Sequence, residues 1–319
     1  MIRYTSSTKT ASTQVVQIKS IITSIVLIAA SITTSAQQID KASLSGQNSS
    51  IVEIFTGVDF NYRDIFDDRP YQFLINLTPG IKWHIWDHMQ LNTGFMVPVL
   101  NQYGKEFARP RLDVLSLSHQ MKFGNLALKP SVGLFTQERY GLDLKAFYTI
   151  TEWMAFELQA GFTGYLSMAQ GWYMSPMSKL LAVGGFDLYL QKWNTQFRIV
   201  GGRFLKDDNG VYAEGIRHFR HTSVGLYLQY SNFNSTTGRQ HANYNGGFKV
   251  VIALPSFNRS NRTVLYRPAD NFRLTYNMNA DPHSCKTYFT DSEQNERHGW
   301  FAPDILPWGA NKIHDFDQK

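Results

Sequence analysis

Apolar and polar residues alternate with a period of two along most of the chain from Ile51 onward. In the stretch Met154 to Met168, one set of alternate positions is almost entirely apolar, whereas the other set contains Glu157 and Gln159. Successive side chains of a β-strand point to opposite faces, but a helix would mix these two sets. The pattern therefore predicts an all-β protein whose strands each have one apolar and one polar face.

The alternation predicts about 12 strands, within a range of 10–14. Most are long enough to cross the hydrocarbon layer of a membrane as tilted strands, which takes about 9–11 residues. The predicted strands are 51–62, 72–86, 89–98, 112–123, 126–136, 140–149, 154–168, 180–191, 195–205, 210–218, 222–232 and 246–254.

The predicted connections alternate in length. Every second one is short, for example Asp87-His88 and Gly124-Asn125, whereas 63–71, 99–111, 169–179 and 233–245 are longer. The links 137–139 and 206–209 break this rule. Membrane barrels have short periplasmic turns and longer outer loops. We therefore predict an antiparallel transmembrane β-barrel that spans 51–255.

The composition favours the same class of fold. Of the 319 residues, 43% are hydrophobic, 14% are aromatic and only 18% are charged. A soluble domain usually carries about 25% charged residues, whereas a membrane barrel needs an apolar outer band and aromatic girdles. The barrel interpretation therefore predicts outer-membrane lipid as a partner.

The N-terminus is typical of an export signal. Lys19 precedes an apolar run of roughly 12 residues, which is short for a spanning helix of about 20, and Ala36 ends a group of small residues. We predict a cleaved signal peptide at 1–36, a flexible leader at 37–50 and an outer-membrane location. A membrane anchor is the alternative. Removing the signal would lower the formal charge from +6 to +3, which gives no electrostatic argument for nucleic-acid binding.

The tail 256–319 is polar and lacks the sustained alternation, apart from one possible further strand at 271–279. It contains the only cysteine, Cys285, which has no partner for an intramolecular disulfide or a Cys-based metal cluster. We predict a polar C-terminal tail outside the barrel.

Charged residues on the predicted strands indicate the lumen, because ionisable groups at membrane depth are costly unless they face the interior. A second candidate group surrounds one predicted turn and would form a polar, glycan-contacting patch; the alternative is an ordinary turn in which Glu214 pairs with Arg203 or Arg217. The lumen candidates are Glu53, Asp59, Lys82, Glu157, Asp187 and Arg198, and the candidate glycan contacts are Arg203, Asp207, Asp208, Glu214 and Arg217.

The stretch Gly201 to Pro255 resembles the YjbH-like family of outer-membrane proteins, which are encoded with exopolysaccharide and capsule genes. The resemblance lies in a GRFL-x-x-D-x-G turn, a strand with an acidic residue and a basic-x-Phe end, and a Gly-rich strand that closes on a hydrophobic-Pro pair. These features fall on Gly202, Arg203, Phe204, Leu205, Asp208, Gly210, Glu214, Arg217, Phe219, Gly247, Leu254 and Pro255. The resemblance implies a non-catalytic role in exopolysaccharide or capsule export, with polysaccharide or periplasmic export-machinery proteins as partners.

Two other classes of function stay open. One is a general porin-like or adhesin barrel that binds ligands through its longer loops. The other is a barrel-embedded hydrolase, although the sequence has no G-x-S-x-G, P-loop, dinucleotide or H-E-x-x-H motif. We expect no catalytic residues, no cofactor and no metal.

Overall fold

The computed structural model describes the chain from Val52 to Asp291 with short gaps. The described residues are 52–63, 72–86, 88–102, 109–168, 172–219, 222–234, 240–253, 259–260, 264–268, 271–277 and 285–291. All of them belong to one compact unit, Ser50–Lys319. The predicted signal peptide 1–36 and leader 37–50 lie outside the described residues.

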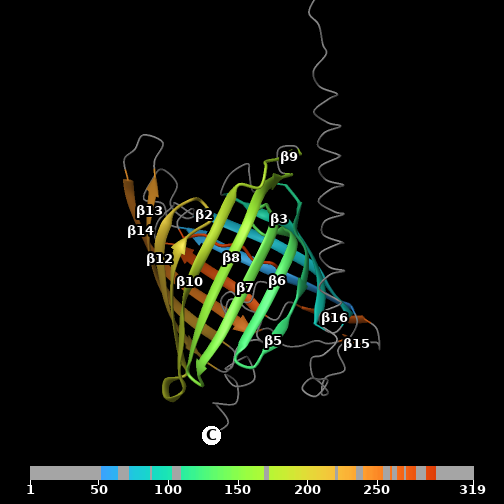
Figure 1. Cartoon of the computed structure of the whole chain (residues 1–319). Coiled ribbons are helices and arrows are strands. Elements are labelled where there is room, and N and C mark those ends of the chain that lie inside the picture. Colours follow the sequence, from blue (N-terminus) through green and yellow to red (C-terminus); the bar gives the residue numbers. More distant parts are fainter. Residues whose placement is uncertain are drawn as a thin grey trace, which may run out of the picture. The chain divides into compact units, whose positions relative to one another are not determined.

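Nearly all of the described residues are in β-strands (Figure 1). No helix among them is long and apolar enough to cross a membrane. The strands are β1 (Val52–Arg63), β2 (Gln72–Trp86), β3 (Met89–Asn101), β4 (Arg111–His119), β5 (Met121–Phe123), β6 (Leu126–Phe135), β7 (Arg139–Thr151), β8 (Met154–Ser167), β9 (Tyr173–Met174), β10 (Lys179–Leu190), β11 (Thr195–Arg203), β12 (Asn209–His218), β13 (Thr222–Asn234), β14 (Gln240–Ala253), β15 (Arg259–Ser260), β16 (Val264–Pro268) and β17 (Asn271–Asn277). A 3-10 turn, η2 (Gln191–Trp193), follows β10.

The sheet closes into a barrel of 13 strands. Sequential neighbours pair in antiparallel fashion from β1 to β14. β4 and β5 follow each other end to end along β6, and β8 pairs with β10. β17 then pairs antiparallel with β14 and parallel with β1, while β16 pairs parallel with the first half of β1. An odd number of alternating strands leaves one neighbouring pair in the same direction, so the parallel seam follows from the count.

The predicted class of fold is confirmed, and most of the predicted strands match the observed ones within a few residues. The possible strand at 271–279 is present as β17, so the barrel does not end at 255 but closes through a segment that was assigned to the tail. The expectation of purely antiparallel pairing is wrong at one place, the seam between β1 and β17.

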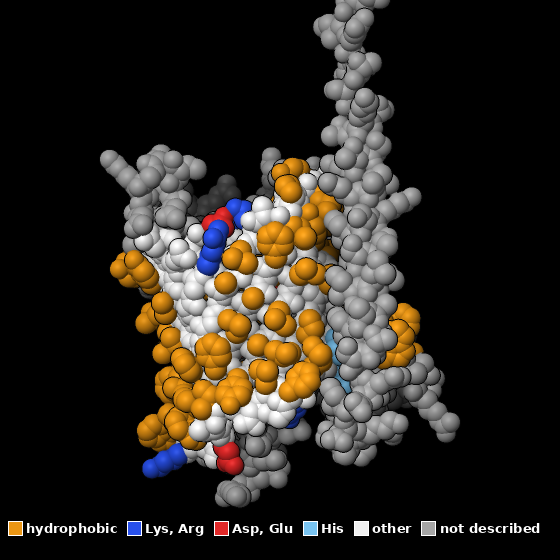
Figure 2. Space-filling view, viewed as in Figure 1, with side chains coloured by type: hydrophobic (Ala, Val, Ile, Leu, Met, Phe, Trp, Pro, Cys, Tyr) orange, Lys and Arg blue, Asp and Glu red, His pale blue; other side chains and the backbone are white. Residues whose placement is uncertain are grey.

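The outer face of the barrel is apolar. Leu226 and Leu228 are 68% and 70% exposed, although both lie in the middle of β13. Figure 2 shows hydrophobic side chains spread over the visible face, with charged side chains gathered towards its two ends. Water would penalise so much exposed apolar surface, whereas lipid would not. The protein is therefore a transmembrane β-barrel.

Exposed aromatic side chains mark the end of the barrel where the connections are short. Each of five short turns carries one such residue, with 49–63% of its surface exposed. Aromatic girdles of this kind lie at membrane–water interfaces. We call this end the short-turn end, and the opposite end the long-loop end. The five residues are Trp86, Phe123, Trp153, Trp193 and Phe219.

Candidate functional site in the barrel lumen

The inward-facing side of each strand carries the polar residues. On β8, the positions Ala155, Glu157, Gln159, Gly161 and Thr163 are all buried. The sequence sets these residues inside because they alternate with apolar residues that face lipid. The lumen therefore contains buried ionisable groups, which must be paired or hydrogen-bonded.

One wall of the lumen is rich in acids. Arg198 on β11 donates from Nε to Glu157 Oε1 at 2.5 Å, and the two side chains are 5% and 0% exposed. Arg198 is also in direct register with Asp187 on β10 and with Glu214 on β12. The single guanidinium thus lies among three carboxylates and binds one of them, Glu157, through two of its donors.

Two further groups complete the acid-rich wall. Gln196 donates to Asp187 at 2.5 Å and faces His218 at 3.2 Å. Glu214 pairs with Lys249 on β14 at 3.3 Å, and the ammonium group of Lys249 lies 5.2 Å from the ring centre of Tyr212. Carboxylates, amides and an aromatic-packed lysine are groups that can bind hydroxylated ligands.

The wall formed by β6 and β7 is basic. Lys129 and Lys145 are in direct register and are 5% and 2% exposed. Asp143, two residues before Lys145, accepts a hydrogen bond from Gln159 Nε2 at 2.9 Å. Arg139, the first residue of β7, is also buried, so this side of the lumen holds three cations against one carboxylate from the wall itself.

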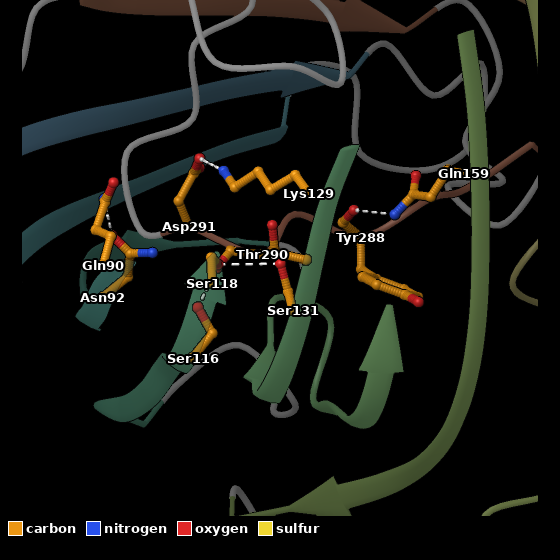
Figure 3. Close-up of polar contacts among 10 residues, drawn as sticks. All are labelled: Gln90, Asn92, Ser116, Ser118, Lys129, Ser131, Gln159, Tyr288, Thr290 and Asp291. Atoms are coloured by element: carbon orange, nitrogen blue, oxygen red, sulfur yellow. Dashed lines mark hydrogen bonds and ion pairs between the residues drawn. The ribbon is translucent and has the colours of Figure 1, made fainter. Parts of the chain in front are cut away.

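Residues 285–291, which we call the inner strap, lie against the inside of the barrel. At the long-loop end the Leu205 amide donates to the Lys286 carbonyl at 3.0 Å, and the Thr136 amide donates to the Phe289 carbonyl at 3.1 Å. Further in, Ser116 donates to the Thr290 carbonyl (Figure 3). The predicted tail is thus partly inside the lumen and not wholly outside the barrel.

The end of the strap makes the deepest contacts. Lys129 Nζ lies 3.3 Å from Asp291 Oδ2, and Gln159 Nε2 donates to the Tyr288 carbonyl at 3.3 Å (Figure 3). The Tyr288 ring stacks on Phe135, with 5.0 Å between ring centres and 5° between planes. Tyr288 and Thr290 are almost fully buried, so the strap fills part of the lumen.

The predicted glycan-contact cluster is divided by the structure. Asp207 lies at the long-loop rim, where it pairs with Lys179 and with Arg203, the latter at 2.9 Å. Partial burial raises the pKa of Asp207, but the hydrogen bonds from Lys179 and Arg203 outweigh this effect and lower it overall. This pair of contacts ties the β11–β12 connection to β10.

The remaining members of the cluster lie apart. Asp208 is buried and accepts from the Cys285 amide at 2.8 Å, and its burial raises the pKa of the carboxyl group. Arg217 is on the outward face near the short-turn end, where it donates to Thr195 at 3.2 Å. The predicted pairing of Glu214 with Arg203 or Arg217 is wrong, because Glu214 pairs with Lys249 and residues three apart on a strand face opposite sides.

The predicted lumen residues on β1 and β2 form a separate group. Glu53 lies 3.2 Å from His84, and the ammonium group of Lys82 is 5.5 Å from the ring centre of Phe55. Asp59 is in register with the buried Asn76. Within the described residues, no group of three or more His, Cys, Asp and Glu side chains could hold a metal ion.

Comparisons with known proteins give only a distant likeness. No protein-family model matches the chain, and no curated protein matches it. Two solved structures of OmpT, an outer membrane protein of Vibrio cholerae, are similar to it. The trimer form is 9% identical over 66% of this chain and 86% of the other, with a TM-score of 0.41, and a second structure is 8% identical over 73% and 97%, with a TM-score of 0.39. Because both TM-scores are low, the fold rests on the strand pairing described above.

The basic wall was missed at the sequence level. Asp143 and Lys145 alternate with Leu142 and Leu144, and the rule that places Glu157 inside applies equally to them. The inner strap gives no such signal, because its residues are held by side chains that are distant in sequence.

Proposed function

We propose that the protein is an outer-membrane barrel that supports exopolysaccharide or capsule export by binding glycan, without catalysing a reaction. The observation that carries this proposal is the lumen, where buried carboxylates, amides and lysines line the inside of an apolar barrel. Sugars are recognised by such hydrogen-bonding groups together with aromatic faces. The resemblance of Gly201–Pro255 to the YjbH-like family supports the same role.

The proposal is tested first by location. A folded barrel in the outer membrane migrates differently on a gel before and after boiling. We expect such a shift in the outer-membrane fraction. A protein that appears only in the soluble periplasmic fraction would contradict the proposal.

Export is tested in a strain that lacks the gene. We expect the strain to secrete less exopolysaccharide or capsule, measured as uronic acid and total hexose in the medium and on the cells. Wild-type protein expressed in trans should restore secretion. Normal secretion without the protein would exclude the export role.

A general porin-like role is the second candidate, and the mixture of charges in the lumen favours it. The inner strap argues against unrestricted diffusion, because it fills part of the lumen. Proteoliposomes separate the two roles. Rapid swelling in small neutral sugars would support a porin, whereas we expect little swelling with the wild-type protein.

A further inference from the structure

Two lysines that face each other across neighbouring strands need anions nearby. Lys129 and Lys145 are in direct register and both point into the lumen. Like charges opposite each other destabilise a strand pair, and buried charges require partners. The wall provides one carboxylate, Asp143, and the inner strap provides the other, Asp291, at 3.3 Å from Lys129.

An aromatic face lies on the same wall, six residues from Lys129 and therefore about 20 Å away along β6. Phe135 is fully buried and stacks on the Tyr288 ring of the strap. Gly161 leaves the room for this ring, because a Cβ atom added there would overlap the Tyr288 hydroxyl. The wall of β6–β8 therefore has a recess that fits a flat ring with a polar edge.

Several polar atoms in this recess are buried without a hydrogen-bond partner. On the wall they are Asp143 Oδ2, Gln159 Oε1 and Thr163 Oγ1, from side chains that are 4%, 0% and 0% exposed, and on the strap the Tyr288 hydroxyl. Buried polar atoms are normally satisfied. Their presence around the Tyr288 ring indicates that the recess can make more hydrogen bonds than the strap supplies.

We propose that this wall is a binding site for a short acidic glycan chain and that the inner strap occupies it as an internal ligand. The Tyr288 ring takes the place of one sugar ring on Phe135, and the Asp291 carboxylate takes the place of a uronate on Lys129 that belongs to another unit of the same chain. When the strap leaves, its carboxylate leaves with it, and the lysine pair then favours an anion. This inference rests on the proposed glycan-binding function and names the class of glycan.

The chemistry distinguishes an acidic sugar from simpler ligands. A neutral sugar would stack on Phe135 but would leave the two lysines with only one carboxylate. A small inorganic anion would neutralise the lysines but would not use the aromatic face. A uronate-containing chain uses both features at once.

An internal ligand lowers the apparent affinity for an external one. The apparent affinity equals the affinity of the open site multiplied by the fraction of molecules in which the site is open. If the strap is in place in at least nine molecules of ten, then releasing it should tighten binding by about tenfold or more. A glycan can therefore bind only when it displaces the strap.

The test uses the full chain refolded in detergent micelles and titrated with hexagalacturonate by calorimetry. The variant Tyr288→Ala/Asp291→Asn, which releases the strap, should bind at least about tenfold more tightly than the wild type. Adding Lys129→Gln to this variant should remove the gain, whereas Lys192→Gln, at an exposed short turn, should keep it. Maltohexaose, a neutral probe, should bind about tenfold more weakly than hexagalacturonate to the released variant.

The heat-dependent gel shift checks the folding of each variant. If the double variant does not fold, Asp291→Asn alone serves instead, because it removes the strap's ion pair with Lys129 and leaves the recess and both lysines unchanged. Hexagalacturonate binding that is no tighter in the released variants, or equal binding of maltohexaose, would overturn the proposal.

Failure of the site and failure of the export role have different signatures. Tight binding of hexagalacturonate together with normal secretion in the gene-deletion strain would support the binding site and contradict the export role. Reduced secretion in that strain, together with no binding of hexagalacturonate to any released variant, would support the export role and contradict the binding site.

Discussion

Arg198 is the residue on which the acid-rich wall depends, because it is in contact or in register with Glu157, Asp187 and Glu214. Removing one member of a buried ion pair costs about 3–5 kcal/mol, since the other charge stays buried without its partner. The wall should therefore be sensitive to changes that leave its charges unbalanced.

We expect Glu157→Gln to lower the free energy of unfolding by about 3 kcal/mol, at the low end of that range because Asp187 stays beside Arg198. Urea unfolding in detergent micelles measures the change. Glu157→Gln combined with Arg198→Met and Asp187→Asn should recover most of the loss, because neither an unpaired cation nor an unpaired carboxylate is then left in the wall. Glu152→Gln, at an exposed turn, is the control. An unchanged urea midpoint in Glu157→Gln would show that the pair does not stabilise the barrel.

Cys285 reports on the position of the inner strap. It is 8% exposed, and burial together with Asp208 raises the pKa of its thiol to about 12. Only the thiolate reacts with maleimide. A thiol with a raised pKa therefore reacts slowly at neutral pH, and its labelling rate continues to increase as the pH rises.

We expect maleimide to label Cys285 at pH 7.5 at least about 100-fold more slowly than an exposed cysteine. The matched control is Cys285→Ser/Lys192→Cys, which carries one cysteine at an exposed turn. Between pH 8 and 10 the rate for Cys285 should continue to increase, whereas that of the control should level off near its own pKa. Equal rates at pH 7.5 would place the strap outside the lumen.

At the scale of the strand, the two-residue alternation was sufficient to predict the long strands, but not the short strands β9, β15 and β16. In β8 it separates Phe156 and Leu158 from Glu157 and Gln159, and the structure places the first pair outside and the second pair inside. The same rule would have found Lys145. The alternation could not find the strap, because a segment that is held by distant side chains needs no period of its own.

Glycines show where a strand departs from regular geometry. Gly133 on β6 has a φ of +139°, and an added Cβ atom would overlap the Leu115 carbonyl oxygen on β4. Gly124, in the turn before β6, has a φ of +56°, and no atom lies within 4 Å of an added Cβ. The two positions share an unusual backbone conformation but differ in the space around them.

We expect Gly133→Ala to destabilise the barrel by about 3 kcal/mol or more, because it adds steric overlap to backbone strain. Gly124→Ala should cost about 1 kcal/mol, from strain alone. The urea midpoint and the yield of the heat-shifted form measure both effects. Equal losses would show that the close contact between β4 and β6 does not limit stability.

At the scale of the whole molecule, the closing seam was the least predictable feature. Asn271–Asn277 is short and its alternation is brief, so its sequence indicated a strand without saying which strands it joins. Closure of β14 directly onto β1 would have been antiparallel and would have given an even number of strands. The structure instead inserts β17 and accepts a parallel pair, whose register places Phe60 opposite Leu274.

This seam can be tested by a disulfide in a Cys285→Ser background. Neighbouring strands lie about 4.8 Å apart, within the Cα separation of about 4.4–6.8 Å that a disulfide spans. Cysteines at Phe60 and Leu274 should therefore cross-link on oxidation and change the mobility of the unfolded chain on a non-reducing gel. Cysteines at Phe60 and Tyr276 are the control, because a shift of two residues adds about 6.6 Å along the strand and puts them beyond reach. Cross-linking of the control pair but not of the first would mean a different register. The absence of both cross-links in a heat-shifted barrel would contradict the pairing of β17 with β1.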